Sequence, residues 1–281
     1  MKHAFLILAH DQFDVLARLI RVLDDKRNDV FIHIDKRVKT IPSLKMDKGN
    51  LQVLDNRIKT YWGDSSLLEA EMLLMQTACS FGNYKYYHII SGVHFPLKDQ
   101  DTIHTLVDSN YPKSLLIPME TSRGEIEYKI GRYHFFVHSL APRGTFRSKA
   151  ANFLWRSLLF VQKPFPVRNI EGIDMKASQW CSLSDIAVKY LVAHKDEALK
   201  RFRHTFCCDE FFVPTMLGGV GLEYVAFPQL MYVKFRRFSP KVLTDEDYAE
   251  MVSSGCLFAR KFGGKSKELM DRIERESLWK G

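Results

Sequence analysis

Residues 2–35, KHAFLILAHDQFDVLARLIRVLDDKRNDVFIHID, decide the fold class of this 281-residue chain. Residues 5–9 form a short apolar run, which predicts a buried strand. Residues 12–24 repeat apolar side chains at helical spacing, and residues 29–35 return to a strand pattern. A strand, a helix and a second strand in this order predict a mostly parallel sheet covered by helices.

The same alternation continues beyond this stretch. Residues 50–54 and 86–91 predict further strands, and residues 65–79 predict an amphipathic helix between them. Ligands of open α/β sheets bind beyond the carboxyl ends of the strands. The residues at or just after such ends are His10, Asp35, Trp62, Gly63, Ser91 and Gly92. Their positions predict a functional site at this edge of the sheet.

The composition is that of one globular domain, with 46% hydrophobic and 26% charged residues and no repeat or linker. The longest apolar runs fall short of the ~20 residues of a membrane span. No cleavage site follows the first apolar run, so we expect no signal peptide. Five cysteines, an odd number without C-x-x-C spacing, predict reduced thiols. We therefore expect a cytoplasmic protein.

The net charge of +8 favours phosphate-bearing partners and leaves nucleotide, nucleic acid and anionic lipid open. Residues 141–170 hold several cations and no acid, interleaved with aromatic and apolar residues. One interpretation is an exposed helix with a buried apolar face, the commonest arrangement. Another is an interfacial helix on an anionic membrane, and a third is a nucleic-acid-binding patch, which no accompanying motif supports. The cations are Arg143, Arg147, Lys149, Arg156, Lys163 and Arg168.

Two D-x-D strings, residues 99–101 and 245–247, are of the kind that holds Mg²⁺ or Mn²⁺ on a diphosphate. Each also precedes a predicted helix, and Thr244 followed by acids is typical of a helix N-terminus. We interpret both strings as helix caps. The chain has no Walker loop, G-x-G-x-x-G or G-x-S-x-G motif, which disfavours dinucleotide-binding and hydrolase functions.

Two later segments carry charged residues in unusual places. Residues 208–212, CDEFF, put two carboxylates directly before an apolar helix, where acids also stabilise the helix dipole. Residues 258–264, FARKFGG, put Arg260 and Lys261 between aromatic residues, although an Arg-Lys pair is by default a solvated pair of charges. Neither segment alone indicates a function.

Together with five earlier segments, they resemble the core-2/I-branching N-acetylglucosaminyltransferase and peptide O-xylosyltransferase family. The chain is similar to a compact form of this family without its signal anchor. The resemblance extends over nearly the whole chain, and seven blocks in this order are far more specific than any one of them. The blocks are LILAH (6–10), IHIDK (32–36), TYWG (60–63), IISGVHFPLK (89–98), KASQW (176–180), DEFF (209–212) and FARKF (258–262).

The resemblance implies a GT-A-like α/β fold, with a mostly parallel central sheet flanked by helices. It implies a single domain over residues 1–281, in which residues 1–120 form a nucleotide-binding half and residues 121–281 an acceptor and catalytic half. It also implies a UDP-sugar donor, inversion at the anomeric carbon and no cofactor or divalent metal, because basic side chains stand where a metal would sit. Departures at His94, Ala177 and Phe235 put the sugar and the acceptor in doubt.

The resemblance also assigns roles to individual residues. Glu210 matches the catalytic carboxylate, and Ser239, Arg260 and Lys261 match positions that contact the diphosphate, with Arg236 or Arg237 close by. A looser match places Glu127, Lys129, Arg132 and Trp180 on the acceptor side. The donor set is Ile7, Leu8, Ala9, Asp35, Lys36, Thr60, Tyr61, Trp62, Gln179, Trp180, Arg237, Ser239, Arg260 and Lys261.

The expected reaction is transfer of a sugar, GlcNAc, from a UDP-sugar to a carbohydrate hydroxyl. Other donors (UDP-xylose, UDP-galactose or UDP-glucose) remain an alternative, as does a catalytically idle carbohydrate-binding protein on a membrane surface. The expected partners are the UDP-sugar, a carbohydrate acceptor that is lipid-linked, and an anionic membrane as a peripheral contact, without nucleic acid. The expected location is the cytoplasm, at the inner face of the cell membrane.

Overall fold

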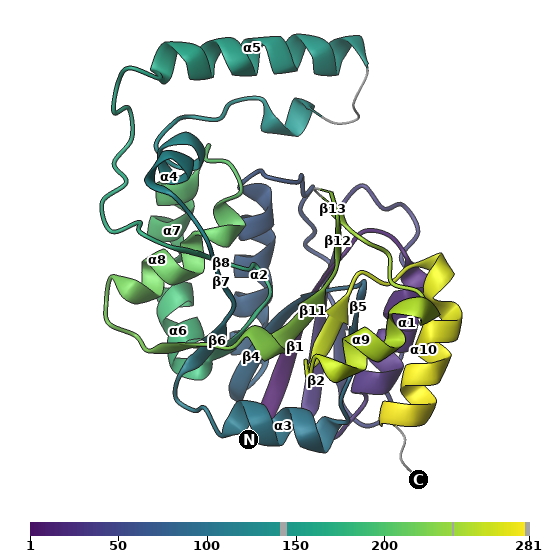
Figure 1. Ribbon diagram of the computed structural model, residues 1–281. Helices are drawn as coiled ribbons and strands as arrows, with labels where there is room; N and C mark the ends of the chain where they lie inside the picture. Colours follow the sequence, from purple (N-terminus) through teal and green to yellow (C-terminus); the bar gives the residue numbers. More distant parts are fainter. Residues whose placement is uncertain (141–144, 238, 279–281) are drawn as a thin grey trace.

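A computed structural model describes residues 1–140, 145–237 and 239–278 (Figure 1). Its centre is a seven-stranded sheet in the order β10-β6-β9-β4-β1-β2-β3. The four strands β3, β2, β1 and β4 run parallel, β9 is antiparallel to both β4 and β6, and β10 is parallel to β6. The strands are β1 Lys2–Ala9, β2 Asn28–Ile34, β3 Asn50–Val53, β4 Tyr84–Ser91, β6 Ser114–Leu116, β9 Cys181–Ser184 and β10 Tyr224–Ala226. The predicted α/β class with a mostly parallel sheet is confirmed.

Helices cover the sheet because each presents an apolar stripe to it. Helix α2 (Ser66–Phe81) packs on β1, β2 and α6 (Asp185–Ala193). Helix α1 (Phe13–Leu23) directs Leu16 and Leu19 into the core of the central sheet and Val15 and Val22 into a second core. It therefore joins the two cores.

The second core lies around a three-stranded sheet of β11 (Met231–Val233), β14 (Phe258–Arg260) and β5 (His94–Pro96). The sequence pattern predicts a strand pair around residues 223–235, but the structure divides these strands between two sheets. The short helical turn η3 (Pro228–Leu230) separates β10 from β11 and redirects the chain.

The remaining elements are short, apart from α5. They are β7 Pro118–Met119, β8 Lys176–Ala177, β12 Phe235–Arg236, β13 Ser239–Pro240, α3 Gln100–Asp108, α4 Arg123–Lys129, η1 Val137–Ser139, α5 Phe146–Gln162, α7 Lys195–Phe202, η2 Cys208–Glu210, α8 Phe212–Gly218, η4 Asp245–Asp247, α9 Tyr248–Ser253, η5 Gly264–Ser266, α10 Lys267–Ile273 and η6 Glu274–Leu278. All five cysteines are free thiols, as expected. Within the described residues, no helix combines the length and apolarity required to cross a bilayer.

Helix α5 lies at the edge of the molecule, away from the central sheet (Figure 1). The interpretation of this segment as a helix with a buried apolar face is wrong. Only Ser148, Ala151 and Leu159 are buried, whereas Phe153 and Phe160 are 70% and 77% exposed. The underlying surface accepts the small residues and one leucine, so the large aromatic side chains remain outside. Residues 141–144, including Arg143, lie outside the described residues.

Candidate functional site

The carboxyl ends of β1, β2 and β4 are joined by backbone hydrogen bonds. The Asp35 amide donates to the Ala9 carbonyl and the Gly92 amide donates to the Leu8 carbonyl, each at 2.9 Å. These bonds bring together the segments that follow three parallel strands, which is where an open α/β sheet binds its ligands.

Asp35 organises the loop beyond β2. Its buried carboxylate accepts two hydrogen bonds from the Arg37 guanidinium, at 2.9 and 2.8 Å, and two from the Thr60 amide and hydroxyl, at 2.9 and 2.6 Å. Burial opposes ionisation of Asp35, but these bonds outweigh it and hold its pKa well below the usual range. Arg37 also lies 4.6 Å above the Tyr61 ring, and the next side chain, Trp62, is 73% exposed. The loop is thus held so that it presents an aromatic surface.

Glu210 ends a short helical turn and is held by a lysine. Its Oε2 accepts a hydrogen bond from Lys129 Nζ at 2.8 Å, and the same ammonium lies 2.9 Å from Glu125, which Lys176 contacts at 2.6 Å. Burial disfavours the charged form of Lys129, but the bonds to Glu210 and Glu125 outweigh it and raise the Lys129 pKa. Burial raises the pKa of Glu125, but the hydrogen bonds from Lys176 and Lys129 outweigh burial and lower this pKa to about 2. This network fixes the Glu210 carboxylate in one orientation.

Two neighbouring acids are buried with unused hydrogen-bonding capacity. Gln179 Nε2 donates to Glu71 Oε1 at 2.5 Å, while Glu71 Oε2 and Asp209 Oδ1 have no hydrogen-bond partner among the described residues. Burial raises the pKa of Glu71 well above its usual range. Burial, with the charge of Glu210, raises the pKa of Asp209 to about 7. Buried polar atoms are nearly always hydrogen-bonded, so these two unsatisfied oxygens are unusual.

Arg260 is a cation without an acidic partner. Its guanidinium carbon lies 4.8 Å from the centre of the Trp180 ring, and its Nε is buried without a hydrogen bond. Within the part of the chain that the structure describes, no carboxylate lies within ion-pair distance of it. Burial lowers the pKa of Arg260 to about 10. A desolvated, unpaired guanidinium is a receptor for an anion.

The small sheet positions Arg260. In the antiparallel register of β5 and β14, Arg260 lies opposite His94. The His94 ring contacts the Trp180 ring edge-on at 4.8 Å, and its Nε2 is buried without a partner. Burial, together with the Arg260 charge, lowers the pKa of His94 well below its usual range. His94 is therefore a neutral group that packs beside the cation.

The β12–β13 hairpin and the segment after it carry further cations. Arg236 pairs with Ser239 across its two strands, and both residues are exposed. The Lys261 amide donates a hydrogen bond to the Lys241 carbonyl at 3.5 Å, and the Leu243 amide donates one to the Lys261 carbonyl at 2.9 Å. The chain that leaves the hairpin thus runs beside the end of β14, so the basic residues of both segments gather at one end of the small sheet.

The other predicted residues are distributed as follows. Ile7 is wholly buried, Leu8 and Ala9 are nearly so, and Lys36 is exposed. Glu127 forms an ion pair with Arg123 at 3.2 Å on the exposed side of α4.

Sequence reasoning missed Glu71, Glu125 and Lys176. Glu71 had a signal, because an acid among the apolar residues of a buried helix is unusual.

Both D-x-D strings act as helix caps. The Asp99 side chain accepts from the Thr102 amide at 2.7 Å, and Asp101 is paired with Arg27 at 2.8 Å. Asp247 accepts from the Thr244 amide at 3.0 Å and from Lys241 at 2.8 Å. The prediction that these acids are caps is confirmed.

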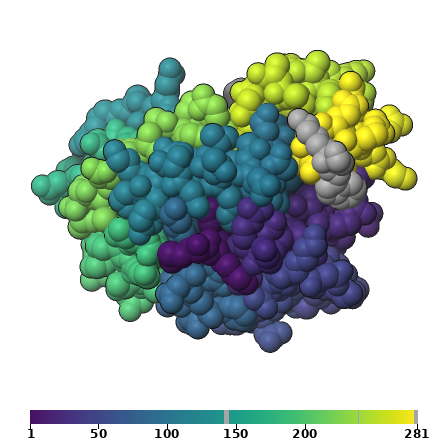
Figure 2. Space-filling model, turned by 90° about the horizontal axis from the view of Figure 1, so that it is seen from below, coloured from purple at the N-terminus to yellow at the C-terminus, as the bar shows by residue number. Residues whose placement is uncertain are grey.

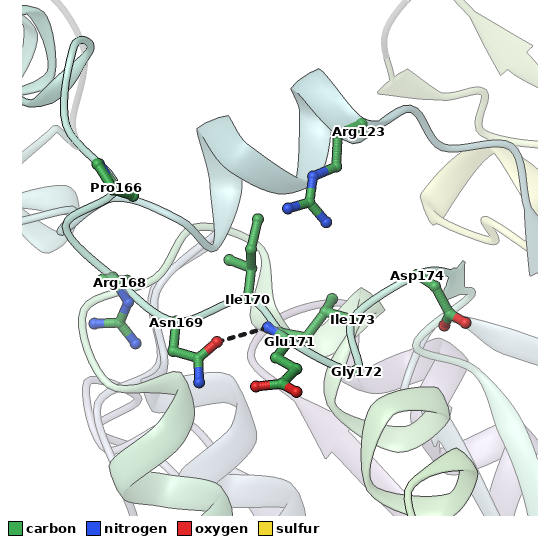
Figure 3. A pocket seen from close by; sticks show the side chains of 9 residues that line it. All are labelled: Arg123, Pro166, Arg168, Asn169, Ile170, Glu171, Gly172, Ile173 and Asp174. Carbon is green, nitrogen blue, oxygen red and sulfur yellow. Dashed lines mark hydrogen bonds between the residues drawn. The ribbon is translucent and has the colours of Figure 1, made fainter.

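A cavity of 710 Å³ lies beside the first residue of helix α4 (Figure 3). It is lined by Arg123 and by the loop of residues 166–174. The loop is shaped by a hydrogen bond from the Glu171 amide to Asn169 Oδ1 at 2.8 Å, drawn in Figure 3.

A second polar cluster lies at the amino end of the strands. Figure 2 shows the side of the molecule on which the N-terminal segment (purple) lies. His3, His104 and Asp108 are close enough to hold a metal ion, and Met1, Lys2 and Arg27 help to line a cavity of 590 Å³ beside them. Lys85 lies 3.2 Å from Asp108 and already supplies a positive charge there. None of the predicted site residues belongs to this cluster.

Comparison with known proteins agrees with the predicted family. Residues 3–224 match the family model described as Core-2/I-Branching enzyme. This match ends before the basic segments that contain Ser239, Arg260 and Lys261.

Among curated proteins no significant match was found. Among solved structures, the crystal structure of S. aureus TarS is similar with a TM-score of 0.30 and 10% identity, over 48% of this chain and 25% of that one. This chain therefore spans a quarter of TarS, and so weak a likeness carries no argument.

The family model covers residues 3–224, which is well over half of the chain. The chain therefore belongs to the Core-2/I-Branching enzyme family.

Proposed function

We propose that this chain is a glycosyltransferase that moves a sugar from a UDP-sugar to a carbohydrate hydroxyl with inversion, using Glu210 as general base. One observation carries the proposal. The Gln179-Trp180 segment contacts the unpaired cation Arg260 on one side and Glu71 on the other. Helix α2, which carries Glu71, packs on the turn η2, which ends at Glu210, so this segment links Arg260 to the neighbourhood of the proposed base.

The chemistry requires one displacement. The acceptor oxygen attacks the anomeric carbon while Glu210 takes the hydroxyl proton, and the bond to the diphosphate breaks with its electron pair leaving on UDP. The transition state resembles an oxocarbenium ion, with negative charge growing on the leaving oxygen. Because attack and departure occur on opposite faces, the configuration inverts and no protein nucleophile is needed.

Lys129 has a positioning role in this scheme. Its ammonium holds the Glu210 carboxylate at 2.8 Å and is itself held by Glu125 at 2.9 Å. An ordered carboxylate loses little conformational freedom when the acceptor arrives, which favours proton transfer.

The basic residues at the end of the small sheet would take the diphosphate. Arg260 can bind phosphate oxygens with its planar fork, and Lys261 adds a point charge beside it. Cations directed at charge that develops in the transition state accelerate the reaction. In this proposal they perform the neutralisation that a divalent ion performs in other transferases, so no metal takes part.

The family resemblance supports GlcNAc as the transferred sugar, and we propose a lipid-linked saccharide at the cytoplasmic face of the membrane as the acceptor. A thermal-shift screen of UDP-GlcNAc, UDP-xylose, UDP-galactose and UDP-glucose would identify the donor. Specific binding to the folded state raises the apparent stability. A larger shift with another donor than with UDP-GlcNAc would change the sugar and leave the reaction type intact.

The test of the mechanism is Glu210→Gln, measured by UDP release and by calorimetric titration with UDP. Loss of a general base is expected to lower turnover by at least about a hundredfold, with UDP affinity within about twofold of the wild-type value. Glu223→Gln is the control, because Glu223 forms an exposed ion pair with Lys113 at 3.4 Å. Turnover of Glu210→Gln within about tenfold of the wild type would remove Glu210 from this role.

A further inference from the structure

The outward side of α5 carries an aromatic stripe. Phe146, Phe153 and Phe160 recur every seven residues, which places them on one side of the helix. They are 88%, 70% and 77% exposed, and Leu154 and Val161 beside them are exposed as well. Monomeric soluble proteins rarely expose so many large apolar side chains together.

A row of cations follows the same helix. Lys149, Arg156 and Lys163 also recur every seven residues, three positions after each phenylalanine, so they lie along one flank of the aromatic stripe. All three are exposed, and none forms an ion pair with a carboxylate among the described residues. Arg147 lies on the other flank, and the helix contains no acid.

The inward side attaches the helix to the protein. Trp155 Nε1 donates to His134 Nδ1 at 3.1 Å, and its ring lies 5.7 Å from Phe206. Phe206 in turn contacts Trp62 edge-on at 5.5 Å, and its amide donates to the Lys129 carbonyl at 2.9 Å. The helix is therefore fixed close to the acceptor side of the site, with its apolar side directed away from the protein.

We propose that α5 binds the surface of an anionic lipid bilayer, with its axis parallel to the membrane and its phenylalanines between the lipid headgroups. An apolar stripe flanked by cations is the pattern of an interfacial helix. The absence of acids gives charge complementarity to anionic headgroups. A second copy of the chain fits less well, because a twofold interface would bring the same cationic patch against itself.

The test is co-flotation of the full chain with vesicles of phosphatidylcholine, with or without phosphatidylglycerol. The wild type is expected to bind the anionic vesicles. The variant K149Q/R156Q/K163Q is expected to bind about a hundredfold more weakly, because each cation near the surface contributes about fivefold. F146S/F153S/F160S should also lose binding, whereas the control K39Q/K48Q/K267Q, made at exposed lysines elsewhere, should stay within about threefold.

Equal binding to both kinds of vesicle, or unchanged binding of the two α5 variants, would overturn the proposal. So would a wild-type dimer that F146S/F153S/F160S converts to a monomer without any vesicle binding. Both α5 variants keep Trp155 and Leu159, so their Tm and UDP affinity should match the wild type. If either variant fails that check, Phe160→Trp replaces it. A blue shift of its fluorescence with anionic vesicles supports the proposal, and an unchanged spectrum contradicts it.

Discussion

The two ends of the central strands carry polar clusters that differ in how well their atoms are satisfied. At the amino end, His3 Nδ1 contacts His88 Nε2 at 3.0 Å, and His88 Nδ1 contacts Ser182 Oγ at 2.7 Å. His104 Nε2 contacts Asn28 Oδ1 at 2.8 Å. Burial lowers the pKa of all three histidines. His3, His88 and Ser182 form a hydrogen-bonded chain, and the His104 ring stacks on His3 at 4.0 Å.

At the carboxyl end, hydrogen-bonding atoms are left unused. Within the described residues, four of the six buried side-chain atoms without a partner lie there, namely Glu71 Oε2, His94 Nε2, Asp209 Oδ1 and Arg260 Nε. Such atoms reduce stability unless a ligand or water satisfies them. The comparison favours a role in folding for the amino-end cluster, and it supports our proposal that the carboxyl-end cluster binds the substrate. It also explains why the cluster that is close enough to hold a metal is the weaker candidate for function.

The largest effect that would test this comparison is expected at Arg260. Arg260→Met should raise the Kd for UDP by about tenfold to a hundredfold, since a hydrogen bond to a charged group contributes about 1.5–3 kcal/mol. The Tm should not fall, because an unpaired, desolvated cation is removed. The measurements are calorimetric titration with UDP and thermal unfolding.

Arg272→Met is the matched control for that variant, because Arg272 lies over the Tyr248 ring at 3.8 Å and is paired with Asp245. It should leave UDP affinity unchanged. Equal UDP affinities of Arg260→Met and the wild type would contradict the assignment of this end of the sheet to binding.

At the amino end we expect a smaller effect, on stability instead of on UDP affinity. Ser182→Ala leaves His88 Nδ1 buried without a partner, which should reduce the free energy of unfolding by about 1–3 kcal/mol and lower the Tm. UDP affinity should not change. Ser253→Ala, at an exposed hydroxyl, is the control for the thermal measurement. A fall in UDP affinity at an unchanged Tm would reverse the roles of the two clusters.

Asp209 gives a test that depends on pH. Its folded-state pKa is raised to about 7, from an unfolded value near ~3.9. The unfolded state therefore loses the proton first, and this group makes the protein less stable as the pH rises from about 4 to about 7. Asp209→Asn should remove that loss, so its Tm relative to the wild type should be higher at pH 8 than at pH 5. A difference that is the same at both pH values would show that Asp209 is not a buried, protonated acid.

Removal of divalent metal is expected to leave turnover unchanged. Both D-x-D strings are engaged as caps, and cations already occupy the proposed diphosphate side. Turnover in EDTA should therefore equal turnover in Mn²⁺ within about twofold, as measured by UDP release. Strict dependence on Mn²⁺ would require a metal at one of the acidic clusters and would weaken the proposed role of Arg260.

Local patterns were sufficient for the elements and for part of the site. The apolar run of β1, the helical spacing of α1 and the run of β2 depend only on neighbours in the sequence, and the structure contains all three. Caps at Asp99 and Thr244 are equally local. Glu210 was identified through a family resemblance, and its role remains a prediction.

The sequence by itself determined the α/β class, the alternation of strands and helices in its first third and the helix caps, because these depend on residue patterns over short stretches of chain. It also indicated the family, through seven such stretches in a fixed order. Only the tertiary structure decided which charges meet. Lys129 bonds to Glu210, and Arg260 lies over Trp180, although the two residues of each pair are about eighty positions apart in the sequence. It also decided that the aromatic side of α5 faces outward. Helical periodicity is the same whether a stripe is covered or exposed, and burial depends on the surface that the rest of the chain provides.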